Sequence, residues 1–120
     1  MARHVPPGWP RDLPPAGTDE FQAKVTGWLL DRGPADLRSS ALRQWPLALA
    51  RYLAHVTAAE LDGTRRAYSM ARVDLGSALA PDELTAVQAA LEAEGARLLQ
   101  VQREVELVET ALRAGIPETL

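Results

Sequence analysis

The residues of this chain that could carry chemistry are few, and their spacing fits no known metal-binding arrangement. His4 and His55 are its two histidines, and it has no cysteine. A metal pair on a helix would need a second ligand one turn away from His55, but Arg51 and Ala59 stand there. The lack of cysteine also excludes disulfides and thiolate ligands. We therefore expect no metal site.

Signatures of nucleophilic catalysis and phosphate binding are also missing. No serine stands in a glycine-flanked elbow motif or near a base in the sequence. No glycine-rich loop of the phosphate-binding type is present. We therefore expect a protein that is not an enzyme and holds no cofactor.

A group of arginines is the one feature that could bind a polyanion. The possible basic patch consists of Arg51, Arg65, Arg66 and Arg72. Such a patch could belong to a nucleic-acid-associated regulator, which we keep as an alternative function. Against it, the net charge is −3, and the segment 81–120 carries eight acidic residues that could pair with these arginines. We therefore do not expect nucleic acid as a partner.

The elements that position these residues are indicated by proline punctuation and by helical periodicity. We predict helices at about 19–32, 46–79 and 81–114, with a short helical turn within 36–44. Pro46 and Pro81 open the two long segments, where proline suits the first helical turn. The long segments have similar lengths and are separated only by a tight turn at position 80, which predicts an antiparallel helical hairpin. The fold class is therefore all-α.

The last helix carries the clearest pattern, an apolar seam with alternating steps of three and four residues. Its apolar members are Leu84, Val87, Leu91, Leu98, Val101, Val105, Val108 and Leu112. Such a seam is typical of coiled-coil packing. Glu94 is the polar exception, and we interpret it as a register-setting residue paired with Arg65 or Arg66. A buried or ligand-binding carboxylate and a local irregularity at Gly95 remain alternatives.

Apolar residues beside the seam indicate that the hairpin has further neighbours. Leu99 and a row of alanines widen the apolar face of the last helix, and the helix before it has two separate apolar faces. The first helix is too short to cover both. We therefore expect an interaction or scaffold protein that acts as a homodimer or binds a helical partner. A small-molecule-binding bundle, with a pocket beneath Trp28, Trp45 and Tyr52, is a further alternative.

Residues 1–17 form a proline-rich arm that precedes a single helical domain, 18–120. Val5, Trp9 and Leu13 recur every four residues and could anchor the arm between helices of its own chain or of a second copy. A disordered tail is an alternative. So is a ligand for another protein, since two of the prolines have the spacing that polyproline-binding domains recognise.

Nothing in the sequence indicates a membrane segment or a secretory leader. The longest apolar runs are shorter than the ~18 residues of a spanning helix, and the N-terminus lacks an apolar core of signal-peptide length. We expect a cytoplasmic protein without membrane contact.

Several short motifs stand out along the chain: Trp28–Asp31, Pro34–Arg38, Leu42–Pro46, Glu94–Leu98, Leu107–Arg113 and the Pro-Gly-Trp-Pro element at Pro7–Pro10. Together they resemble an uncharacterised family of small helical proteins from high-GC bacteria. The resemblance implies a helical fold over most of the chain. It implies no function, because the family has no assigned activity.

Overall fold

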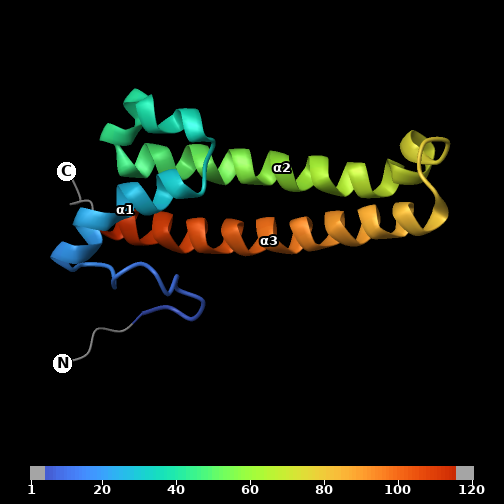
Figure 1. The fold of residues 1–120 in the computed structure, drawn as a ribbon. Helices are drawn as coiled ribbons and strands as arrows, with labels where there is room; N and C mark the ends of the chain where they lie inside the picture. The colour runs from blue at the N-terminus through green and yellow to red at the C-terminus, as the bar shows by residue number, and fades with distance from the viewer. Residues whose placement is uncertain (1–4, 116–120) are drawn as a thin grey trace.

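A computed structural model describes residues 5–115, which form an all-α fold. Its α-helices are α1 (Asp19–Asp31), α2 (Pro46–Leu75) and α3 (Pro81–Ala114), and two 3-10 helices, η1 (Ala35–Ser39) and η2 (Ala41–Gln44), connect α1 to α2. The long helices α2 and α3 run antiparallel beside each other, and the shorter α1 packs at one end (Figure 1). The predicted hairpin with a shorter N-terminal helix is therefore confirmed. His4 and residues 116–120 lie outside the described part.

Helix α1 begins where the sequence predicts it, and Thr18 is the residue that caps it. The Thr18 hydroxyl accepts a hydrogen bond from the backbone N–H of Phe21 at 3.1 Å and so satisfies one free donor of the first turn. Phe21, Val25 and Leu29 repeat at four-residue steps and are buried. This stripe holds α1 against the hairpin.

Helix α2 ends at Leu75, four residues before the predicted boundary at 79. The carbonyl of Leu75 accepts hydrogen bonds from the N–H groups of Ala78 and Leu79, so the chain closes into a turn instead of continuing as a helix. Pro81 opens α3 and disfavours a helical conformation at Ala80, which is extended with φ −66° and ψ 157°. The connection therefore occupies residues 76–80 rather than position 80 alone.

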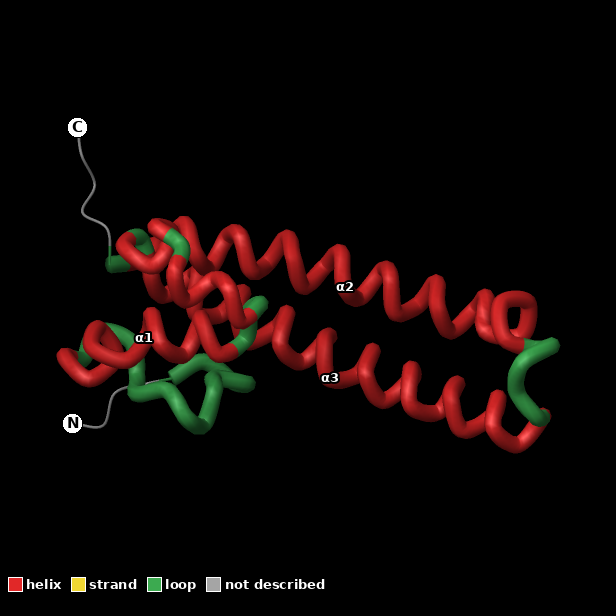
Figure 2. Tube along the Cα trace, turned by 45° about the horizontal axis from the view of Figure 1, so that its top comes forward, coloured by secondary structure: helices red, strands yellow, loops and turns green. Residues whose placement is uncertain are grey.

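The core lies at one end of the hairpin, which we call the head. There, α1, the 3-10 helices and the arm pack on the first half of α2 and the second half of α3 (Figure 2). The buried residues of the head are Leu13, Phe21, Val25, Trp28, Leu29, Leu30, Leu37, Leu49, Ala50, Leu53, Val105 and Val108. The remainder of the hairpin, 57–75 of α2 and 81–99 of α3, is only two helices thick, and we call it the distal half.

The proline-rich arm packs on its own chain but does not run straight along the hairpin. It turns at Gly8, whose φ of +85° suits glycine, and the N–H of Trp9 bonds to the carbonyl of Pro6 at 3.1 Å. A second glycine with positive φ, Gly17, lies just before α1. The arm therefore folds beside α1 and the C-terminal half of α3 (Figure 1).

Candidate functional site

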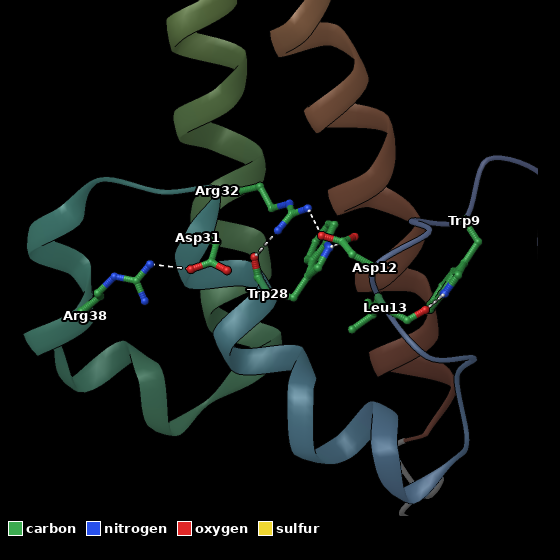
Figure 3. Close-up of polar contacts among 7 residues, drawn as sticks. All are labelled: Trp9, Asp12, Leu13, Trp28, Asp31, Arg32 and Arg38. Atoms are coloured by element: carbon green, nitrogen blue, oxygen red, sulfur yellow. Dashed lines mark hydrogen bonds and ion pairs between the residues drawn. The ribbon is translucent and has the colours of Figure 1, made fainter.

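A polar contact fastens the arm to α1 (Figure 3). The Asp12 carboxylate accepts hydrogen bonds from the Trp28 indole Nε1 and from the Arg32 guanidinium, both at 2.8 Å. Arg32 also lies over the Trp28 ring, 3.9 Å from its centroid, in cation–π geometry. The hydrogen bond from Arg32 is the main reason that the pKa of Asp12 is lowered. Asp12 therefore stays ionised and holds both partners.

The three predicted arm anchors differ in burial. Leu13 is 4% exposed and belongs to the head core, whereas Val5 is 38% exposed. Trp9 is half-buried, its ring centroid lies 5.9 Å from that of Phe21, and its indole N–H donates to the Leu13 carbonyl at 3.0 Å. Of the predicted anchors, Leu13 and Trp9 therefore make apolar contacts, and Pro10 between them, which was not predicted as an anchor, is fully buried.

The apolar seam of α3 is most buried near the head. Leu98, Val105 and Val108 are buried, and the other five members are half-buried: Leu84, Val87, Leu91, Val101 and Leu112. Burial decreases toward the distal half because only α2 packs there.

Glu94 does not pair with α2, contrary to the sequence-based interpretation. Its carboxylate accepts two hydrogen bonds from Arg97, one turn further along α3, at 2.6 and 3.1 Å. These hydrogen bonds lower the pKa of Glu94. The side chain is 44% exposed, so the pair lies at the surface. Arg97, three residues further along the same helix, is therefore the partner of Glu94 in place of Arg65 or Arg66. The alternative hypothesis of a buried carboxylate is also wrong.

The arginines of the possible basic patch do not form one uniform surface. Arg51 contacts Glu109 of α3 at 3.1 Å, and Arg66 lies 3.8 Å from Asp62 on its own helix. Within residues 5–115, Arg65 and Arg72 are in no ion pair. Two of the four arginines are therefore partly neutralised by neighbouring carboxylates.

Glu109 joins the ends of α2 and α3 at the head. Burial raises its pKa, but hydrogen bonds from Arg113 at 3.0 Å and Arg51 at 3.1 Å outweigh this, so its pKa is lowered overall. The carboxylate is therefore ionised at neutral pH, with one cation on each helix.

The three aromatic residues predicted to line a ligand pocket do not lie together in one site, and, among the described residues, His55 is not part of a metal site. Trp28 is buried with its indole bound to Asp12, whereas Trp45 and Tyr52 are exposed. His55 is exposed and its ring contacts Arg51 at 3.0 Å. In the part of the chain that the structure describes, no three His, Cys, Asp or Glu residues gather as they would around a metal ion. No helix in that part is both long and apolar enough to span a membrane.

The clearest surface feature is a groove of about 330 Å³ between α2 and α3 in the distal half. Its α2 wall is formed by Leu61, Thr64, Arg65 and Tyr68. Its α3 wall is formed by Leu91, Glu92, Gly95, Ala96 and Leu99. The lining is mainly apolar, and small residues at 95 and 96 keep it open. We refer to this set of residues as the distal groove.

The distal groove opens on the side of the hairpin away from α1. Glu60 and Arg97 line the crevice beside the end of α1. Glu60 is five residues from Arg65 of the groove, and Arg97 is five residues from Glu92 of the groove. Five residues correspond to about 140° around a helix, so the groove lies on a different side of the hairpin from the crevice beside α1. No element among residues 5–115 covers the groove, although the alanines and Leu99 beside the seam indicated in the sequence that α3 has an extra neighbour.

A second exposed apolar surface follows the outer side of α2. Tyr52, Val56, Met70 and Val73 lie at helical steps, and Val73 is 76% exposed. Between them, a Cβ added at Gly63 would meet nothing within 4 Å. We call this the outer stripe. The outer stripe accounts for the second apolar face of α2.

These features define the class of the molecule as an all-α helical hairpin with an N-terminal cap at one end and an open apolar groove at the other. No protein-family model matches the chain, and neither a curated protein nor a solved structure matches it. The resemblance to a family of small helical proteins therefore stays a prediction.

Proposed function

We propose that this chain is a non-enzymatic interaction protein that acts as a homodimer through the distal half of its hairpin. The observation that carries the proposal is the open distal groove, in a part of the molecule where the hairpin has no third layer. Tyr68, which is 41% exposed, lines this groove. Large apolar side chains of this kind are enriched in the centres of protein interfaces.

The difference between the two ends of the hairpin supports this assignment. At the head, α1, the arm and the 3-10 helices cover the apolar side chains of α2 and α3. In the distal half, Leu84, Val87 and Leu91 are only half-buried although they continue the same seam. A second hairpin would provide the missing layer and complete a four-helix bundle.

The alternative functions have weaker support. The arginines of α2 are interspersed with Glu60, Asp62 and Asp74, which makes a continuous surface for a polyanion less favourable. The open distal groove is the only feature of the described residues that supports a small-molecule site, and it suits the side chains of a protein partner equally well.

Sedimentation velocity of the full chain, over concentrations of about 1 to 100 μM, tests the proposal. We expect a mass that approaches twice the 13.0 kDa of the monomer. Tyr68→Glu should weaken the dimer, whereas Tyr52→Glu should not, because Tyr52 is equally exposed but lies near the head. A monomer at every concentration would refute the homodimer, and equal effects of the two variants would place the interface elsewhere.

A further inference from the structure

We propose that the second copy packs groove to groove, about a two-fold axis parallel to the long axis of the hairpin, so that Arg65 pairs with Glu92 of the second copy. This inference rests on the proposed function and specifies which face is used and how the copies are oriented. It follows from the shape, the charges and the area of the distal half.

The shape of the groove suits side chains from an identical surface. A Cβ at Gly95 would lie 4.0 Å from side-chain atoms of Leu61 and Thr64, and the exposed Tyr68 and Ala96 line the groove on opposite helices. A second copy presents the same arrangement, and side chains at the same level of the two hairpins can interdigitate, which is the knobs-into-holes packing of helical bundles. Such an interface is isologous, with the same patch on both copies.

The charges on the two walls distinguish between the possible orientations. Arg65 on α2 and Glu92 on α3 line the same groove, both are exposed, and neither is in an ion pair within residues 5–115. A two-fold axis along the hairpin exchanges the walls, so α2 of one copy faces α3 of the other at the same level. Each Arg65 then meets a Glu92, twice per dimer.

The other face-to-face arrangement brings like charges together. When the two grooves are centred on each other, a two-fold axis across the hairpin at the level of Arg65 and Glu92 would place α2 on α2 and α3 on α3, so that Arg65 would meet Arg65 and Glu92 would meet Glu92. Like charges facing each other across an interface are unfavourable and select against that orientation. With the grooves centred on each other, the charges of the groove face are therefore complementary only when the two heads lie at the same end.

The available area is sufficient for a specific contact. From Thr57 to Leu75, α2 is about 28 Å long, and two packed helices are about 20 Å wide. The footprint is therefore roughly 550 Å² on each copy, or about 1,100 Å² in total, just above the lower limit of biological interfaces. The outer stripe presents only one helix and offers a smaller footprint, which favours the groove.

Charge reversal in the full-length protein, followed by sedimentation equilibrium, tests the orientation. We expect Arg65→Glu and Glu92→Arg each to raise the dimer dissociation constant at least about tenfold, because both pairs become repulsive. The double variant Arg65→Glu/Glu92→Arg should return to within about threefold of the wild type, because the pairs are restored with exchanged signs. Arg66→Glu is the matched control, since the Arg66 side chain is 79% exposed and lies outside the groove lining, and it should leave the constant unchanged.

The possible results separate this inference from the proposed function. A stable dimer that neither single reversal weakens overturns the orientation and leaves the homodimer intact, because in the crossed arrangement each single reversal replaces one repulsion by another. If the single variants weaken the dimer and the double variant does not restore it, the proposed orientation is also overturned. A wild-type chain that stays monomeric overturns both. Unchanged melting temperatures of the single variants show that the hairpin itself is folded.

Discussion

Replacing Leu13 by alanine tests whether the arm is an integral part of the fold. Leu13 is 4% exposed and belongs to the same buried cluster as Phe21 and Trp28. Leucine-to-alanine changes in protein cores cost about 2–5 kcal/mol. The arm lies at the edge of the head and can relax into part of the space, so we expect a loss of about 2 kcal/mol, at the low end of that range.

Urea denaturation followed by circular dichroism gives the free energy of unfolding. All variants are measured at one fixed protein concentration, because dimerisation would contribute to the measured stability. Val5→Ala is the matched control: Val5 belongs to the same arm but is 38% exposed, and its loss should cost less than about 0.5 kcal/mol. If Leu13→Ala also costs less than about 0.5 kcal/mol, the arm contributes no core packing in solution, and the description of the head core is wrong.

Two further substitutions probe backbone packing and the charges at the head. Gly33→Ala should destabilise the protein by about 1–2 kcal/mol, because the new Cβ would lie 2.7 Å from a methyl of Leu53. Gly63→Ala, with nothing within 4 Å, should stabilise it by up to about 1 kcal/mol; thermal melts that rank the two variants in the opposite order would contradict the packing. Glu109→Gln should cost about 1 kcal/mol at pH 7 through its bonds to Arg51 and Arg113. Because the pKa of Glu109 is lowered in the folded state, the wild type has this advantage above the ordinary glutamate value of 4.5 and loses it as the pH falls further. A difference in urea stability that stays constant down to pH 3 would argue against the ion pairs.

The parts of the fold that the sequence predicted depend on local signals. Pro46 and Pro81 open α2 and α3, and the seam from Leu84 to Leu112 identified the face of α3 that meets α2. These signals lie within one or two helical turns, where periodicity is informative. The early end of α2 could not be predicted, because its reason is the turn between Leu75 and Ala80, whose hydrogen bonds depend on where the next helix must begin.

The parts that the sequence did not predict depend on competition between partners. The sequence-based interpretation paired Glu94 with Arg65 or Arg66 of the other long helix, and the structure shows Arg97 of the same helix as its partner instead. The turn at Gly8 likewise depends on contacts that the arm makes with the head. The distal groove was only indicated, since Leu61 and Leu99 were recognisable as apolar positions but not as walls of one surface.

The uneven burial along the hairpin has a consequence for the order in which the chain can fold. Contacts next to the turn at 76–80 close very short loops, whereas the ion pair between Arg51 and Glu109 joins residues 58 positions apart. Loop-closure entropy rises with that separation, so the distal half can form first at the least entropic cost. The same half contributes the least buried apolar surface, and the head contributes the most. The end that is easiest to start is therefore not the end that stabilises the product.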